Sequence, residues 1–131
     1  MLNEDLKDRI REAYNAIVES KSLTPRWGQR QMIAEIANTL SRIPPPGENH
    51  SDLPAVCVIE AGTGTGKTIA YAVAAITMAR ALGKRLVVAT ATIALQEQFV
   101  NKDLPDIRQS SGMDFTFALA KGRRRYVCLS K

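Results

Sequence analysis

One glycine-rich stretch constrains what this chain can fold into more than any other feature. It reads Ala-Gly-Thr-Gly-Thr-Gly-Lys-Thr over residues 61–68, with an apolar run over 55–59 before it and an apolar helical pattern over 69–82 after it. A strand, a glycine-rich loop, a Lys-Thr pair and a helix, in this order, are typical of a phosphate-binding P-loop. We therefore expect the stretch to bind a nucleoside triphosphate.

Each residue type in the stretch has a chemical role. Glycines let the backbone fold around a phosphate with its N–H groups pointing inward. We expect Lys67 to reach the β- and γ-phosphates and the Thr68 hydroxyl to hold a bridging Mg²⁺, which makes these two the candidate catalytic residues. Ala61 stands where the strict pattern has glycine, and the alternative is a glycine turn without a ligand. The expected nucleotide-binding residues here are Ala61, Gly62, Thr63, Gly64, Thr65, Gly66, Lys67 and Thr68.

The charge of the chain is unevenly distributed. The net charge is +5, and residues 121–131 contain Lys121, Arg123, Arg124, Arg125 and Lys131 but no acid. The remaining residues carry as many basic as acidic side chains, so the whole excess lies at this end. Such a basic cluster often contacts phosphate backbones. The alternative is a solvated basic tail.

Length and composition set further limits. A chain of 131 residues suffices for one domain with a moderate core. No run approaches the roughly 20 apolar residues of a membrane span, and the acidic N-terminus is not a secretory signal. We expect a cytoplasmic protein with no membrane partner. Two cysteines do not form a disulfide framework, and we expect Cys57 to be buried in a strand.

The hydrophobic pattern predicts an α/β fold. Helices are expected over residues 3–20, from Thr24-Pro25 to 41, up to 82 after the P-loop and over 92–102, with short helix or turns over 104–113. Strands are expected over 55–60, 85–90 and 115–119, and a proline-rich, flexible loop over 42–54. Strand–helix units in succession predict a parallel sheet, with ligands at the carboxyl ends of its strands.

A polar segment upstream of the P-loop is a candidate for nucleotide recognition. A glutamine amide can pair with the N6/N7 edge of adenine, so Gln29 would favour ATP over GTP. Arg26 lies three residues earlier. Trp27 either covers the adenine or belongs to the core.

A second candidate anion site follows the expected second strand. Thr90, Thr92 and Gln96 lie where that strand ends and the next helix begins. Hydroxyl groups at a helix N-terminus suit an anion, and because the triphosphate already has a cradle, a nucleic-acid backbone is the expected ligand. The alternative is that Thr92 only caps the helix.

Together these segments resemble a known family. An Arg-x-x-Gln, the segment Glu60 to Thr68 and the segment Val87 to Gln96 are similar to motifs Q, I and Ia of superfamily 2 helicases. The run Gly-Arg-Arg-Arg-Tyr-Val-Cys ending at Cys128 and the run Asn101 to Pro105 resemble the DinG-type, XPD-like iron–sulfur branch.

The resemblance implies an ATP-driven 5′–3′ DNA helicase acting in DNA repair or replication. It implies an incomplete RecA-like P-loop NTPase domain with a parallel sheet, preceded by two N-terminal helices. It divides the chain into four parts: N-terminal helices with the Q-like segment over residues 1–41, the proline-rich, flexible loop over 42–54, the first part of motor domain 1 over 55–120, and the basic start of an iron–sulfur region over 121–131. It implies ATP and Mg²⁺, a 4Fe–4S cluster in the intact parent with Cys128 as first ligand, and single-stranded or forked DNA near Thr90, Thr92, Gln96, Arg123, Arg124 and Arg125.

Parts of the helicase pattern are absent from these residues. The chain has no Asp-Glu-x-His, the acid pair that orders Mg²⁺ and the attacking water, and one thiolate cannot hold a 4Fe–4S cluster. We therefore expect the first part of a helicase that hydrolyses ATP hardly at all alone and leaves the edges of its P-loop strand bare. The competing interpretations are a generic P-loop ATPase and a non-enzymatic nucleic-acid-binding module.

Overall fold

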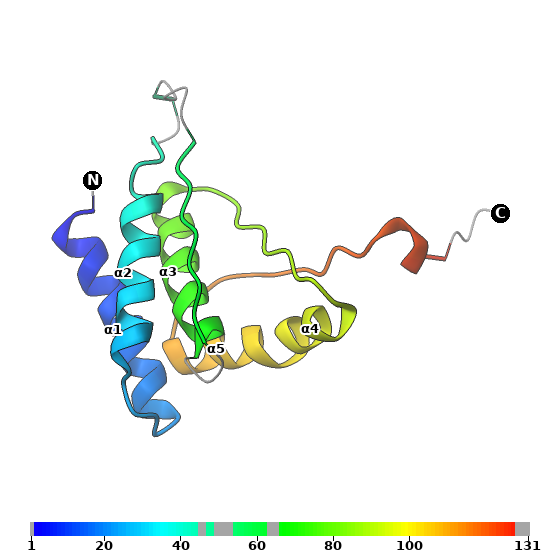
Figure 1. Ribbon diagram of the computed structural model, residues 1–131, viewed down its shortest axis with the longest axis horizontal. Coiled ribbons are helices and arrows are strands. Elements are labelled where there is room, and N and C mark those ends of the chain that lie inside the picture. Colours follow the sequence, from blue (N-terminus) through cyan, green and yellow to red (C-terminus); the bar gives the residue numbers. More distant parts are fainter. Residues whose placement is uncertain (1, 45–46, 49–53, 63–65, 128–131) are drawn as a thin grey trace.

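The computed structural model describes residues 2–44, 47–48, 54–62 and 66–127 (Figure 1). Helices dominate this part of the chain. A π turn, η1, connects two of them, and a 3-10 turn, η2, lies near the C-terminus. In chain order the elements are α1 (Glu4–Ser20), α2 (Trp27–Leu40), α3 (Lys67–Leu82), α4 (Ile93–Gln98), η1 (Phe99–Asp103), α5 (Leu104–Ser111) and η2 (Arg123–Arg125).

Helix α1 begins where its sequence predicts. The Asn3 side chain accepts a hydrogen bond from the Leu6 amide at 2.8 Å, and Glu4 and Asp5 occupy the first turn, where negative charge is favourable. Helix α2 begins at Trp27, later than the Thr24-Pro25 start that we expected, and its N-cap Arg26 makes no side-chain cap. Both helices bury an apolar face that packs on α3.

Helix α3 lies at the centre of the helical layer. Helices α1 and α2 both pack against it, and α1 also contacts α5 (Figure 1). Its buried side chains are mostly small, which lets neighbouring helices approach closely: Ala70, Ala72, Val73, Ala74, Ala75, Ile76, Thr77 and Met78. Gly83 ends the helix in the left-handed conformation with φ of 63°, so the helix ends at residue 82 as predicted.

Helices α4 and α5 form one nearly continuous helical segment, interrupted by η1. The sequence predicts a break at Pro105, because proline has no amide hydrogen and its ring clashes with the carbonyl four residues earlier. The structure instead places the wider π turn up to Asp103, and α5 begins at Leu104, includes this proline and continues to Ser111. Gly112 then ends it with φ of 71°.

The predicted strands do not form in the described residues. Residues 54–61, 84–90 and 113–122 are extended but pair in no β-ladder, so the expected parallel sheet is not present there. A strand is stabilised by hydrogen bonds and side-chain contacts to its neighbours, and these three segments run without strand partners alongside or away from the helices (Figure 1).

The unpaired segments expose side chains that a sheet would bury. Val58 is 92% exposed and Val87 is 80% exposed. Cys57 is also exposed, so the expectation of a buried cysteine is wrong. In the third segment, Met113, Phe115 and Phe117 pack against the helical core. None of the described helices is long and apolar enough to span a bilayer.

Candidate nucleotide and nucleic-acid site

The N-terminus of α3 carries the residues expected to bind phosphate. Gly66 is its N-cap, in the left-handed conformation with φ of 70°, and provides no side-chain cap. Lys67 and Thr68 form the start of the first turn, whose backbone N–H groups lack partners within the helix. A helix N-terminus of this kind favours an anion such as a phosphate. The P-loop residues Thr63, Gly64 and Thr65 lie outside the described residues.

Position 66 requires glycine for two reasons. Side chains with the L configuration rarely adopt its backbone conformation. A Cβ atom there would also lie 1.9 Å from Nε2 of Gln29. The close approach of α2 to the loop and the left-handed turn therefore both depend on the missing side chain.

Gln29 is buried behind the turn at Gly66, which is expected to bind phosphate. Only 6% of it is exposed, its Oε1 accepts a hydrogen bond from the Tyr14 hydroxyl at 2.7 Å, and its Nε2 donates to the Gly66 carbonyl at 3.4 Å. The amide thus has a protein partner at each end and keeps one further N–H and one lone pair. Contact with adenine stays a prediction.

Tyr14 is a residue that sequence reasoning missed. Its spacing placed it on the apolar face of α1, and that face is indeed buried. A buried tyrosine hydroxyl needs a hydrogen-bond partner, and this was the available signal. The partner, however, lies on another helix and could not be identified from spacing.

Two other residues of the upstream segment face outward. Trp27 is 77% exposed, so it does not belong to the core, and the interpretation in which it covers a base remains. Arg26, the N-cap of α2, is exposed as well. Both side chains can reach a ligand without disturbing the helical core.

A cavity of about 590 Å³ opens beside the start of α3. It brings Lys67 and Thr68 together with Thr90, which the sequence placed in a separate anion site. The remaining wall is partly apolar and partly polar: Met32, Ile36, Cys57, Ile59, Tyr71, Ala89, Ala91, Leu95, Gln98, Phe99 and Asp103. The cavity is therefore shared by the candidate phosphate site and the end of the second extended segment.

Two titratable groups in this cavity have shifted pKa values. Burial raises the pKa of the Tyr71 phenol, while its hydrogen bond with Thr68 acts in the opposite direction. Burial also raises the pKa of the Asp103 carboxyl, against the attraction of Lys102 and Lys21. The hydroxyl expected to hold Mg²⁺ is thus in contact with the phenol of Tyr71.

The residues expected near single-stranded DNA are engaged within the chain. The Leu95 amide donates to the Thr92 hydroxyl at 3.2 Å, so Thr92 does cap α4, as the alternative interpretation predicts. The Thr90 hydroxyl donates to the carbonyl of Thr92 at 3.2 Å. Gln96 donates through Nε2 to the Ala120 carbonyl at 3.2 Å. All three residues keep exposed or half-exposed surface.

The three consecutive arginines are not equivalent. Arg125 donates to Oε1 of Gln96 and lies 3.6 Å from the Glu97 carboxylate, and its side chain is 24% exposed. Arg123 and Arg124 are exposed on η2. Arg125 thus connects the basic segment to α4, whereas its two neighbours face solvent.

The described residues do not fit a resident metal cluster. They contain no group of three or more His, Cys, Asp or Glu side chains placed to hold a metal ion. A 4Fe–4S cluster needs four protein ligands, normally thiolates, and the sequence has two cysteines. Cys128, the expected first ligand, lies outside the described residues. Thr68 lies in the first turn of α3, two residues after Gly66, and its hydroxyl is an oxygen ligand of the kind that Mg²⁺ takes.

The sequence is similar to a set of bacterial helicases. Residues 26–124 match the DEAD/DEAH box helicase family. Over 132 residues the chain is 42% identical to the ATP-dependent DNA helicase DinG of Photobacterium profundum, an alignment that covers 100% of the chain and 18% of that protein. Proteins of the same name from Salmonella typhimurium and Escherichia coli are 44% identical over 128 residues, which is 97% of the chain and 16% of each relative. The chain thus spans less than a fifth of the length of these curated relatives.

Proposed function

The chain belongs to the DEAD/DEAH box helicase family, and from that premise we propose that it forms the ATP–Mg²⁺-binding part of a DinG-type ATP-dependent DNA helicase. Membership of the family implies a RecA-like fold. We propose that the three extended segments become strands of the parallel sheet of that fold when further strands pair with them. The relatives are ATP-dependent DNA helicases by name, which supports ATP as the nucleotide and DNA as the polymer.

One observation carries the nucleotide proposal. The start of α3, with Gly66 in the left-handed conformation and Lys67 and Thr68 in the first turn, opens onto a cavity of about 590 Å³. Inward N–H groups, a lysine and a hydroxyl at one helix N-terminus are the groups that a magnesium-bound triphosphate needs. The loop from Ala61 and Gly62 through Thr63, Gly64 and Thr65 would complete the cradle.

Each residue of the proposed site has a separate task. The Lys67 ammonium neutralises charge on the β- and γ-phosphates. The Thr68 hydroxyl, which is hydrogen-bonded to Tyr71, would hold Mg²⁺, and the ion would supply further charge neutralisation. Arg26 and Trp27 would lie on the adenine side, where the exposed indole offers a stacking surface, and Gln29 would contact adenine through the N–H and the lone pair that its protein partners leave.

We propose that single-stranded or forked DNA passes Thr90, Thr92 and Gln96 and continues to the basic segment. Arg123 and Arg124 are exposed and suit phosphate oxygens. Gln96 and Arg125 would have to exchange their mutual contact for contact with DNA. A 4Fe–4S cluster with Cys128 as its first ligand remains part of the proposal for the parent helicase, as do 5′–3′ unwinding and a role in repair or replication.

Substitution of Lys67 tests the nucleotide proposal. Lys67→Ala should weaken binding of a fluorescent ATP analogue in the presence of Mg²⁺ by at least about tenfold, because it removes a charge-assisted contact to phosphate. Fluorescence anisotropy of the 131-residue chain measures the affinity. The control Lys84→Ala, an exposed lysine just beyond the other end of α3, should bind like the wild type. Equal affinity of Lys67→Ala and the wild type would contradict the proposal.

A further inference from the structure

A chain of hydrogen bonds joins three helices at the phosphate-binding turn. Tyr14 on α1 donates to Oε1 of Gln29 on α2 at 2.7 Å, and Nε2 of Gln29 donates at 3.4 Å to the carbonyl of Gly66, the N-cap of α3. Tyr14 is 4% exposed and Gln29 is 6% exposed. The bond between Tyr14 and Gln29 is buried and therefore costly to leave unmade, whereas the bond from Gln29 to Gly66 is partly buried.

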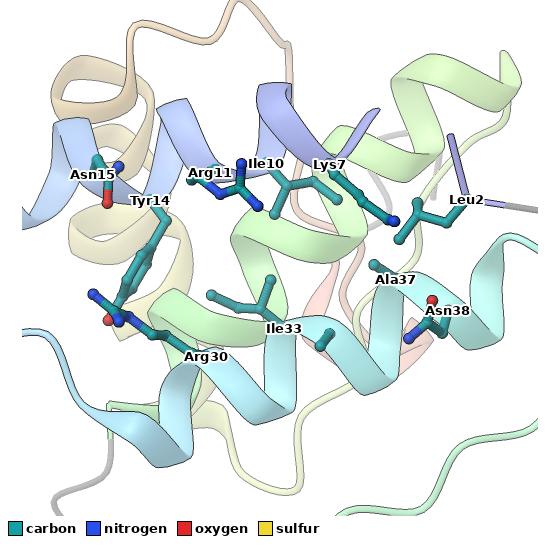
Figure 2. A pocket seen from close by; sticks show the side chains of 11 residues that line it. Leu2, Lys7, Ile10, Arg11, Tyr14, Asn15, Arg30, Ile33, Ala37 and Asn38 are labelled. Carbon is teal, nitrogen blue, oxygen red and sulfur yellow. The ribbon is translucent and has the colours of Figure 1, made fainter. Parts of the chain in front are cut away.

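Tyr14 reaches this position across the groove between the two N-terminal helices. Figure 2 shows its ring extending from α1 toward α2, beside Ile33 and Arg30. The groove holds a cavity of about 460 Å³, and Tyr14 forms part of its wall. The ring belongs to the core cluster that also includes Ile10 and Ile33. The hydroxyl is thus held by packing of the ring, and it is not free to follow the glutamine if the glutamine moves.

The tyrosine hydroxyl decides which way the glutamine amide faces. A donor at Oε1 places Nε2 toward Gly66, where a carbonyl oxygen accepts it. The reversed amide would bring two acceptor oxygens together at Gly66. Without the hydroxyl, Oε1 loses its buried partner and the amide orientation is no longer fixed from this side.

The carbonyl of Gly66 in turn orients the first amide of α3. No cis peptide bond occurs in the described backbone, and in a planar trans peptide the C=O of Gly66 and the N–H of Lys67 point in opposite directions. This carbonyl accepts two hydrogen bonds, one from Nε2 of Gln29 at 3.4 Å and one from the Ala70 amide at 3.3 Å. The helix bond and the Gln29 bond therefore hold the direction of the Lys67 N–H together. That N–H is one of the groups expected to face phosphate.

From this geometry we propose that Tyr14 is a positioning residue for the phosphate site, acting through Gln29 on the peptide that joins Gly66 to Lys67. Tyr14 itself touches no ligand. It keeps the turn in its phosphate-binding form before the nucleotide arrives, so that less ordering is needed on binding. This inference rests on the proposed function for its consequence in nucleotide affinity, but the hydrogen-bond relay can be tested without nucleotide.

Tyr14→Phe is the direct test, because it removes one oxygen and keeps the ring. In the full chain it should weaken binding of the fluorescent ATP analogue about three- to tenfold, the range of one lost hydrogen bond. Inorganic triphosphate, used as a competitor, should lose affinity by the same factor, since the effect arises at the phosphates. In a Gln29→Ala background, Tyr14→Phe should change neither affinity further.

Two controls separate positioning from stability. Ile17→Val removes a methyl group from a fully buried residue one turn away and should lower the melting temperature while leaving nucleotide affinity unchanged. Tyr126→Phe removes a hydroxyl that accepts from the Lys121 amide, far from the relay, and should also leave the affinity unchanged.

A spectroscopic measurement on the nucleotide-free chain completes the test. The backbone amide resonance of Lys67 should shift in Tyr14→Phe and stay in place in Ile17→Val. Two results would overturn the relay. One is a Lys67 amide resonance that does not shift in Tyr14→Phe. The other is a double variant whose loss of nucleotide affinity equals the product of the losses in the two single variants. If the resonance shifts but the wild type binds neither ATP nor triphosphate, the relay stands and the proposed function fails.

Discussion

At the scale of single residues, Gly66 has the most demanding position among the described glycines. It combines a left-handed backbone with a side-chain position that Gln29 already occupies. Among the described glycines, Gly28 is the opposite case, since a Cβ atom there would meet nothing within 4 Å. The two positions therefore form a matched pair for substitution by alanine.

Gly66→Ala should destabilise the chain by about 1–2 kcal/mol, because an L residue in the left-handed region carries that cost. It should also weaken binding of the ATP analogue, since either the turn or the Gln29 side chain must shift to relieve the contact. Gly28→Ala should stabilise by about 0.5 kcal/mol through its higher helix propensity. Urea denaturation measures both values, and a Gly66→Ala chain as stable as the wild type would show that the left-handed turn is not required.

Asp103 gives a prediction for pH. Because burial raises the pKa of its carboxyl, the folded state holds the proton more tightly than the unfolded state. Its contribution to stability is therefore present below the ordinary aspartate pKa and is lost as pH rises through the raised value. Asp103→Asn should remove this loss and raise the melting temperature at pH 7 by up to about 2 °C.

Thermal melts of Asp103→Asn and the wild type between about pH 3 and pH 7 check this prediction. The exposed Asp114→Asn is the matched control and should follow the wild-type curve. A lower melting temperature for Asp103→Asn at neutral pH would mean that attraction by Lys102 and Lys21 outweighs burial.

At the scale of elements, the side chain of Arg125 connects η2 to α4. Its contacts with Gln96 and Glu97 leave Arg123 and Arg124 as the exposed pair. Arg123→Ala combined with Arg124→Ala should lower affinity for a single-stranded oligonucleotide and make the salt dependence shallower by about 0.7 per lost phosphate contact. Arg125→Ala should change the slope less. Anisotropy titrations over a salt series measure the slopes. Equal slopes in all variants would indicate that the basic segment is solvated and does not contact DNA.

The elements also show what the sequence could predict. Helix α1 begins after its cap Asn3 and helix α3 ends at Gly83, as expected, because caps and apolar stripes are local properties of the sequence. The three strands were predicted from apolar runs such as Leu86 to Ala89, but a strand depends on partners from other parts of a fold, and the described residues supply none. The link between Tyr14 and Gln29 was missed for the same reason, since it depends on how two helices pack.

At the scale of the whole molecule, the chain divides into a packed helical layer and exposed extended segments. Val58 and Val87 project from those segments with most of their surface in water. Exposed apolar side chains on unpaired extended backbone favour association with other chains. The wild-type chain should therefore self-associate with rising concentration.

Val58→Thr combined with Val87→Thr should reduce that self-association, because threonine keeps the β-branched shape but is polar. Sedimentation velocity over a concentration series measures the effect. The control Val73→Thr lies inside α3, fully buried, and should lower stability without reducing association. A wild-type chain that stays monomeric at all concentrations would contradict the prediction.

The small residues of α3 have one more consequence, for how such a sequence can change over time. Ala70 and Ala74 are completely buried in the helical core against which α1 and α2 pack. A larger side chain at either position would push a neighbouring helix outward, and with it Tyr14 or Gln29. Substitutions at Ala70 and Ala74 are therefore expected to affect the proposed nucleotide site as well as the packing of the core.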